Sequence, residues 1–405
     1  MPEHIEPLPA DAILLHVGFH KTGTTALQSA FASTRAQLLE AGVLYPGSQR
    51  SHHRAAMAVT DRTWGWGDKG GRPPRAKYWD EVVRASRAHP GRVMLSSEAL
   101  SLARKAHLDR IIADLGADRL HVITTLRPFT RLLSSSYQQY LKYGLTLPYD
   151  TWLESAFADP PQCPPSPNFW RRNDHAGVME RWAARLGPHR VRLVVLDESD
   201  RNGLFRTFEG LLGLPEGLLV PDPELSASNR SMTAAEAELL RLINVGGASD
   251  WDWPAYQDGI RRGAVMRMVE SRRPSRDEPG LATPEWAVHA GQAFGRQTAD
   301  RVAALGIPVH GDLGRLAAPI KAGEAPAELL LPVAAAAEAV LGGVLGTAGT
   351  LPGRTDLEAA KQAAAQAGRQ AIDELTTRDT AALLRTRLGQ ARRRRMAKVR
   401  AGRRQ

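Results

Sequence analysis

Short apolar runs rich in valine, leucine and isoleucine recur along the first 200 residues and predict buried β-strands. Stretches with apolar residues at helical spacing separate them. This alternation predicts an α/β fold, with a parallel sheet flanked by helices on both faces. The predicted strands cover residues 12–17, 43–45, 92–97, 120–126 and 191–196. The predicted helices cover residues 26–31, 34–41, 76–88, 103–115, 151–157, 175–186, 204–212 and 233–243.

The pattern divides the chain into three parts. Residues 10–315 are expected to form one α/β domain, residues 316–335, rich in alanine and proline, a linker, and residues 336–405 a helical, basic C-terminal extension. Thr233 with Glu236 three residues later is typical of a capping box at a helix start. The later predicted elements of the domain are helices at 251–273 and 285–305 and a closing segment at 308–312.

The segment after the first predicted strand has the pattern of a phosphate-binding loop. Gly18 and Gly23 have the separation of the two glycines in an ATP-type P-loop, and Thr25 stands at its Ser/Thr position. Thr24 takes the place of the P-loop lysine, whereas the loop's own lysine, Lys21, precedes the second glycine. A strand, a glycine loop and a helix direct N–H groups and the helix dipole at an anion. We therefore predict a P-loop-like nucleotide site whose lysine approaches the phosphates from a different side.

This loop resembles the 5′-phosphosulfate loop of the PAPS-dependent sulfotransferases of bacterial type, where PAPS is 3′-phosphoadenosine 5′-phosphosulfate. The resemblance rests on the run Lys21, Thr22, Gly23, Thr24 and Thr25. It implies that the loop holds the 5′-phosphate and that the lysine contacts the bridging oxygen and the sulfuryl group. His20 flanks the lysine and is expected either to help hold the sulfuryl group or to support the loop.

A second motif follows the strand predicted at 120–126. Arg127 stands at the strand end, and Ser134 and Ser135 lie in the first turns of the next predicted helix. In the sulfotransferases an arginine and a serine in these places hold the 3′-phosphate, so the resemblance implies that role here. Ser135 has the family's usual offset, but Pro128 directly after the arginine leaves Ser134 as a competitor. Without the resemblance, the arginines would be read as surface residues of a solvated helix.

The resemblance also indicates where the base should stand. In cytosolic sulfotransferases a histidine just past a central strand takes the acceptor proton, and here Glu98 follows the strand predicted at 92–97. Other branches of the family use a glutamate, and burial could raise its pKa into a useful range. The alternative is that Glu98 caps the following helix. His52 and His53 are rival bases, or simply solvated histidines.

Two further segments are expected to contact a ligand, one the acceptor and the other the 3′-phosphate of PAPS. Residues 46–75 are rich in glycine, arginine, histidine and proline, and predict an irregular functional loop in which Trp64 and Trp66 could line an acceptor pocket. Arg230 precedes a predicted helix, and the resemblance implies that it closes on the 3′-phosphate. The sequence lacks the Arg-Lys-Gly that the family usually has at that point.

Composition suits a cytoplasmic globular enzyme. The chain has 405 residues, of which 43% are hydrophobic, enough for a large core. Its one cysteine, Cys163, excludes an intramolecular disulfide and a cysteine zinc site. We find no signal peptide, no transmembrane segment and no metal motif. The exclusion of a metal is incomplete, because Asp197 and Glu198 follow the strand at 191–196 and could hold magnesium.

The net charge of +10 belongs to the C-terminus. Residues 381–405 contain ten arginines and lysines and no acid, so residues 1–380 are formally neutral. Such a tail could contact an anionic surface, or could be a solvated extension that aids solubility.

Three functions are compatible with these features. The first is transfer of a sulfuryl group from PAPS, leaving PAP (the desulfated cofactor), to a hydroxyl or amine of a small-molecule or saccharide acceptor, without a metal. The second is a P-loop kinase or NTPase, opposed by the missing lysine after Gly23. The third is a non-catalytic protein that binds anions or nucleic acid through the tail.

Overall fold

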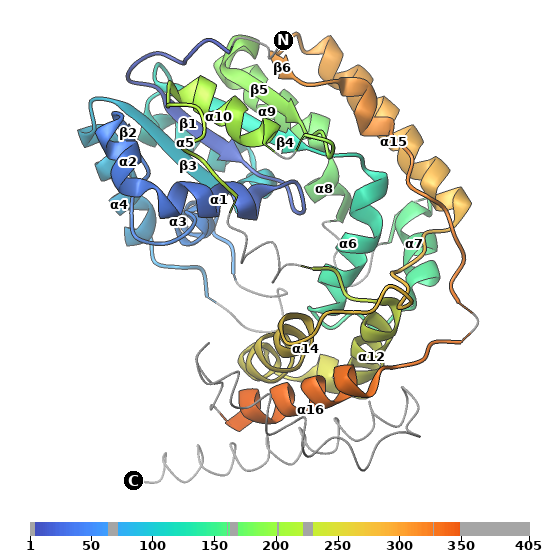
Figure 1. Ribbon diagram of the computed structural model, residues 1–405. Helices are drawn as coiled ribbons and strands as arrows, with labels where there is room; N and C mark the ends of the chain where they lie inside the picture. The colour runs from blue at the N-terminus through green and yellow to red at the C-terminus, as the bar shows by residue number, and fades with distance from the viewer. Residues whose placement is uncertain are drawn as a thin grey trace, which may run out of the picture.

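The computed structural model describes residues 5–63, 72–159, 161–162, 169–200, 202–221, 230–326 and 328–348 (Figure 1). Its centre is a parallel sheet in the order β2-β3-β1-β4-β5-β6. The strands are β1 (Ile13–Val17), β2 (Val43–Leu44), β3 (Arg92–Ser97), β4 (Leu120–Leu126), β5 (Val191–Val195) and β6 (Val309–His310). The predicted parallel α/β sheet is thereby confirmed, and the closing segment at 308–312 supplies its sixth strand.

Alternate residues of β1 face opposite sides of the sheet, where two different helical layers cover it. Ile13 and Leu15 join a core formed with α3 (His53–Val59), α4 (Lys77–Ala88), α5 (Lys105–Leu115) and α9 (His175–Leu186). Leu14 faces the other side and joins a core with α1 (Thr24–Ser33), α2 (Arg35–Glu40) and α10 (Gly203–Leu212). Because both faces are covered, all five residues of β1 and all seven of β4 are buried.

The strand order places a topological switch point between β1 and β4. From β1 the chain moves to β2 and β3 on one side, whereas from β4 it moves to β5 and β6 on the other. Ile13 pairs with Val93 of β3 and with Leu120 of β4, so β1 lies between them. In open parallel sheets, ligands bind beyond the carboxyl ends of the strands at such a point.

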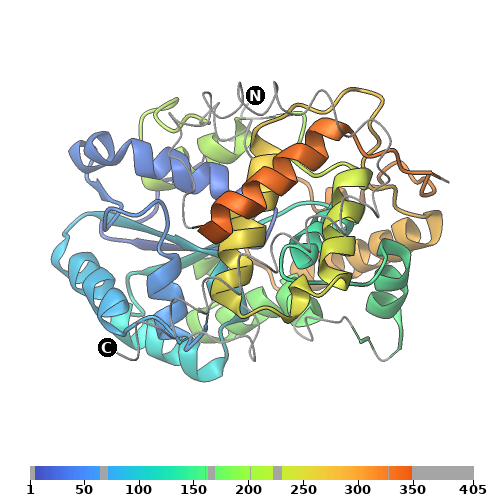
Figure 2. The same cartoon turned by 90° about the horizontal axis from the view of Figure 1, so that it is seen from below.

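A separate helical layer packs around its own core below the carboxyl ends of the strands (Figure 1). Its members are α6 (Thr130–Leu141), α7 (Tyr149–Phe157), α12 (Ala234–Val245), α13 (Trp253–Tyr256), η4 (Gln257–Val265, a π-helix), α14 (Met266–Glu270) and α16 (Val333–Ala348). Viewed from below, α16 crosses the helix formed by η4 and α14 (Figure 2). The predicted capping box at Thr233 and Glu236 is confirmed at the start of α12.

The remaining elements connect these bodies. They are η1 (Glu98–Leu102), α8 (Phe169–Asn173), η2 (Pro188–Arg190), η3 (Ala248–Asp250), α15 (Glu285–Ala304) and η5 (Leu313–Ala317). None of the helices in the described ranges is long and apolar enough to cross a membrane.

The prediction of an irregular loop at 46–75 was wrong in part, because α3 occupies residues 53–59. Ala55, Met57 and Val59 are buried against α4 and η1, so tertiary packing stabilises a helix that the surrounding glycine, histidine and arginine residues obscured. Trp64 and Trp66 lie outside the described residues, as does Cys163.

Residues 316–335 connect η5 to α16 along the surface of the molecule. The Thr130 hydroxyl donates to the Ala318 carbonyl at 2.9 Å, and the Gly323 N–H donates to the Thr283 carbonyl at 3.0 Å. α16 supplies the helical C-terminal extension up to Ala348. The basic tail at 381–405 lies outside the described residues, and its contact with an anionic surface stays a prediction.

Candidate active site

The loop between β1 and α1 has a backbone shaped for an anion. Lys21 and Gly23 both adopt left-handed conformations, with φ of 66° and 78°. A Cβ added to Gly18 would lie 2.7 Å from the Thr24 hydroxyl, so the first glycine is required by a close approach. The Thr22 hydroxyl donates to the Phe19 carbonyl at 2.9 Å and pins the loop.

The helix that follows this loop begins without a side-chain cap. Its first intrahelical hydrogen bond runs from the Leu27 N–H to the Gly23 carbonyl at 3.1 Å. The N–H groups of the first turn, including those of Thr24 and Thr25, therefore have no intrahelical acceptor. With the helix dipole, they form a site that suits a phosphate oxygen.

Arg127 lies next to this loop, as expected for the ends of two adjacent strands. Its Nη1 donates to the Lys21 carbonyl at 3.2 Å. Its Nη2 pairs with Glu198, which also pairs with Arg131 at 3.1 Å. The structure thus places one carboxylate between two guanidinium groups, and the sequence gave no sign of this pairing.

Ser134 and Ser135 lie on α6, and both are partly exposed. The Ser135 hydroxyl donates to the Leu132 carbonyl at 3.1 Å within its own helix. Hydroxyl-to-backbone bonds of this kind are weak and easily exchanged for a ligand. Both serines stay candidates for the second phosphate.

Lys21 projects as an exposed side chain in a positive environment. The surrounding groups remove part of the hydration of the Lys21 ammonium group, which lowers its pKa. The charge of the Arg127 guanidinium lowers it further. Lys142, at the end of α6, has its pKa lowered to about 7 by burial and by the charges of Lys21 and Arg261. The helical layer therefore adds positive charge near the loop, which favours an anionic ligand.

Glu98 stands at the carboxyl end of β3, on the opposite side of β1 from Arg127. Its Oε1 is 3.8 Å from His53 Nδ1, and its Oε2 accepts from Gln28 Nε2 at 3.4 Å. Burial lowers the pKa of His53, an effect partly offset by Glu98. The two rival bases are thus neighbours, and the carboxylate keeps 26% of its side-chain surface exposed.

His52 and His20, the other two histidines considered for the site, have different environments. His52 is buried, accepts from the Ser96 N–H at 3.0 Å, and has its pKa lowered to about 4 by burial. His20 has a pKa well below its usual value because of burial, followed by the charges of Arg172 and His53. His20 is therefore neutral at pH 7 and close to the cations of the site.

A buried polar chain that sequence reasoning missed supports the loop from below. His16 Nδ1 is 2.9 Å from the Ser96 hydroxyl and its Nε2 is 3.2 Å from the Thr125 hydroxyl. Thr125 in turn lies 3.0 Å from the Thr22 hydroxyl, and Gln28 donates to Ser96 at 3.1 Å. The chain joins β3, β1, β4 and the loop. A histidine inside an apolar strand was its only sequence signal.

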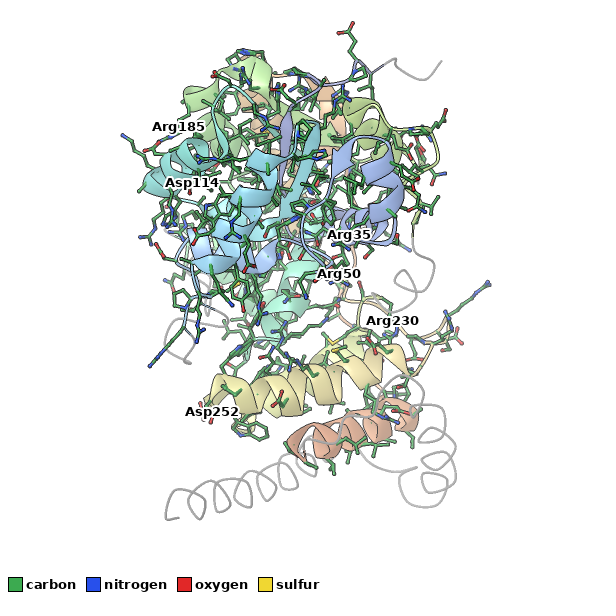
Figure 3. The ribbon with its side chains drawn as sticks, turned by 90° about the vertical axis from the view of Figure 1, so that its left-hand side faces the viewer. Arg35, Arg50, Asp114, Arg185, Arg230 and Asp252 are labelled. Carbon is green, nitrogen blue, oxygen red and sulfur yellow. The ribbon has the colours of Figure 1, made fainter. Side chains whose placement is uncertain are left out.

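Arg230 belongs to a different set of contacts. It makes a two-point ion pair with the fully buried carboxylate of Glu236, at 2.7 and 2.8 Å, and donates to the Met268 carbonyl at 3.1 Å. Arg272 pairs with the same carboxylate. Figure 3 shows Arg230 beside η4 and α14, below the sheet domain. Its charge, like that of Lys21, lowers the pKa of Lys142, so Arg230 lies near the same lysine, and its role at the 3′-phosphate stays a prediction.

Asp197, the possible magnesium ligand after β5, binds other residues of the protein. Asp197 accepts from the Ser199 N–H at 2.9 Å and pairs with Arg315 at 2.8 Å. Among the described residues, no group of three or more histidine, cysteine, aspartate or glutamate side chains is arranged to hold a metal ion.

Comparison with known proteins adds one structural similarity. Neither the protein-family models nor the curated proteins contain a match. The chain is similar to the crystal structure of a sulfotransferase from Alicyclobacillus acidocaldarius, with a TM-score of 0.36 and 16% sequence identity. The similarity covers 60% of this chain and 98% of that one. The function proposed below therefore rests on the residues of the site.

Proposed function

We propose that this protein is a sulfotransferase that moves a sulfuryl group from PAPS to a hydroxyl or amine acceptor. The observation that carries the proposal is the contact between Arg127 and the Lys21 carbonyl at the switch point of the sheet. It sets a guanidinium beside a phosphate-binding loop, as a nucleotide with two separate phosphates requires. ATP has no 3′-phosphate, so an ATP enzyme has no need of a second phosphate site.

The residues present fit this cofactor. The loop of residues 18–24 and the uncapped start of α1 suit the 5′-phosphate end, and Lys21 stands within the same loop. Arg127, with Ser134 or Ser135, suits the 3′-phosphate once Glu198 is displaced. When bound, PAPS supplies a sulfuryl group on a phosphate leaving group.

The chain's own residues supply charge and a proton acceptor. Lys21 neutralises the negative charge that develops on the leaving oxygen. Glu98 accepts the proton that the acceptor hydroxyl loses, and His53 at 3.8 Å holds or exchanges it. Gln28 orients the same carboxylate from α1.

Calorimetric titration of PAP against ADP and ATP, with and without Mg²⁺, tests the proposal. We expect PAP to bind without metal and more tightly than ADP, and to bind at least 10-fold more weakly to Lys21→Ala and to Arg127→Ala. Arg296→Ala, an exposed arginine on α15, serves as the control. Preference for ATP with a magnesium requirement would refute the sulfotransferase and favour the P-loop kinase.

The non-catalytic alternative is tested by truncation. Removal of residues 381–405 should leave PAP binding and turnover largely intact if the protein is the proposed enzyme. If the tail instead carries the function, the truncated chain should lose anion binding altogether.

A further inference from the structure

Four arginines converge on the side of the site where Glu98 stands. Arg62 follows α3, Arg104 follows η1, and Arg171 and Arg172 lie on α8. η1 begins at Glu98 and packs against both α3 and α8, so the four lie on or beside elements that adjoin this short helix. We call Arg62, Arg104, Arg171 and Arg172 the arginine cluster.

The arginine cluster differs from the other arginine groups of the protein in its partners. Arg230 and Arg301 each pair with carboxylates at 2.7 to 2.8 Å. Within the described residues, by contrast, no member of the cluster has a carboxylate oxygen within 4.0 Å. Arg172 is partly buried, and its Nε is buried without a hydrogen-bond partner. Arg230 also has an unpartnered Nε, but its other nitrogens pair with Glu236, whereas Arg172 has no carboxylate partner among the described residues. The charge of Arg172 therefore favours an anionic ligand.

The charges in the arginine cluster act on one another and on the reactive groups. Burial and then Arg172 and Arg171 lower the pKa of Arg62 to about 10. Burial and then Arg172 also lower the pKa of His20. The positive potential therefore extends from α8 to the loop that precedes α1.

The arginine cluster lies beside both groups of the proposed site, because α8 packs against η1, which begins at Glu98, and against Phe129, two residues after Arg127. The sheet order puts Glu98 on the β3 side, and Arg127 with its partner Glu198 on the β4 and β5 side. The proposed function assigns the donor phosphates to the loop of residues 18–24 and to Arg127. The arginine cluster has no part in that assignment and is available to the acceptor.

We propose that the acceptor carries an anionic group of its own, a carboxylate or a sulfate ester, which the arginine cluster binds while a neighbouring hydroxyl faces Glu98. This inference rests on the sulfotransferase function proposed above. Guanidinium groups bind carboxylate and sulfate oxygens in pairs. They would fix the acceptor's orientation as well as raise its affinity.

Binding of two matched pairs of saccharides tests the inference. One pair is a galacturonate hexasaccharide and its methyl ester, and the other is sulfated maltohexaose and maltohexaose, each titrated by calorimetry with saturating PAP. We expect the charged member of at least one pair to bind 10-fold or more tightly than its neutral partner. The pair that shows the difference identifies the anionic group as a carboxylate or a sulfate ester.

Two double variants locate the effect. Arg62→Gln with Arg172→Gln should reduce the preference to less than two-fold. Arg104→Gln with Arg171→Gln changes only exposed residues and should reduce it at least three-fold without affecting folding. Arg296→Gln, exposed on α15, should leave it unchanged.

The possible results separate the two proposals. Equal or absent binding of the charged and neutral forms, or a preference that survives in both folded double variants, would overturn the anionic acceptor. PAP is titrated separately into the same proteins. Retained PAP binding with no charge preference refutes only the acceptor, whereas loss of PAP binding in the unmodified protein refutes the sulfotransferase.

Discussion

At the scale of single residues, the site is defined by which charges are paired. Lys21 is exposed in a loop that suits an anion, whereas Arg127 and Arg131 share Glu198. Because Glu198 is itself 47% exposed, its pairing with Arg127 is weak and reversible. Under the proposed function, a phosphate with two charges would displace Glu198, and this competition would set part of the affinity for PAPS.

Substitution of Glu198 should therefore strengthen cofactor binding. In Glu198→Gln the carboxylate no longer competes, so we expect PAP to bind about 3- to 10-fold more tightly, as calorimetry would measure. Glu216→Gln, an exposed carboxylate that follows α10, is the matched control. Unchanged or weaker PAP binding in Glu198→Gln would show that Arg127 does not contact the phosphate.

Glu98 should act on turnover rather than on cofactor affinity. Glu98→Gln keeps the size and the contact with Gln28 but cannot take a proton, so we expect kcat to fall about 10²- to 10⁴-fold. PAP affinity should change less than two-fold, because Glu98 lies on the other side of β1 from Arg127. If Glu98→Gln retains kcat, Glu98 is not the base, and His53 becomes the candidate for that role.

At the scale of elements, the helical layer depends on a close helix crossing. A Cβ added to Gly263 of η4 would lie 2.4 Å from the Gly342 carbonyl oxygen of α16. A Cβ on Gly342 would lie 2.3 Å from the Gly263 oxygen. Backbone atoms cannot move aside as a flexible side chain can, so both glycines are required by contact and not by backbone conformation.

Alanine at this crossing should destabilise the protein. We expect Gly263→Ala to lower the free energy of unfolding by about 1–3 kcal/mol, despite the better helix propensity of alanine. Chemical denaturation measures the effect. Gly280→Ala, where a Cβ meets nothing within 4 Å, should change it by less than about 0.5 kcal/mol. Equal stabilities of the two variants would contradict the close crossing.

At the scale of the whole molecule, buried histidines link stability to pH. Burial lowers the pKa of His16 and of His175 to about 3, and that of His52 to about 4. In the unfolded chain each would titrate near 6.5. Between these values the unfolded state binds protons that the folded state does not, so stability rises with pH and is lost as the pH falls below about 6.5.

Acid should therefore destabilise the fold at a mild pH. We expect the free energy of unfolding to fall by up to about 1.4 kcal/mol per pH unit for each of these histidines between pH 6.5 and 4.5. Urea denaturation at a series of pH values measures this slope. A stability that stays constant from pH 7 to pH 5 would show that the three histidines are protonated in the folded protein.

The sequence predicted the parallel sheet and the convergence of Lys21 with Arg127, because both depend on local information. Buried strands are visible as apolar runs, and the carboxyl ends of parallel strands share one edge. The pairing of Arg230 with Glu236 could not be predicted, since it involves Met268 and Arg272 from distant segments. Helix α3 could not be predicted either, because it is stabilised by burial against α4 and η1 and its own sequence has no clear helical pattern.

The amino-acid sequence alone determined the α/β class and the capped start of α12, and it predicted a phosphate-binding loop at residues 18–24. These follow from periodicity and from backbone preferences that act over a few residues. Only the tertiary structure decided which charged and polar groups meet: Glu198 with two arginines, His16 with the hydroxyls beneath the loop, and the four arginines of the cluster with one another. Electrostatic and hydrogen-bond partners depend on distances of a few ångströms between segments far apart in the chain, and no local pattern encodes them.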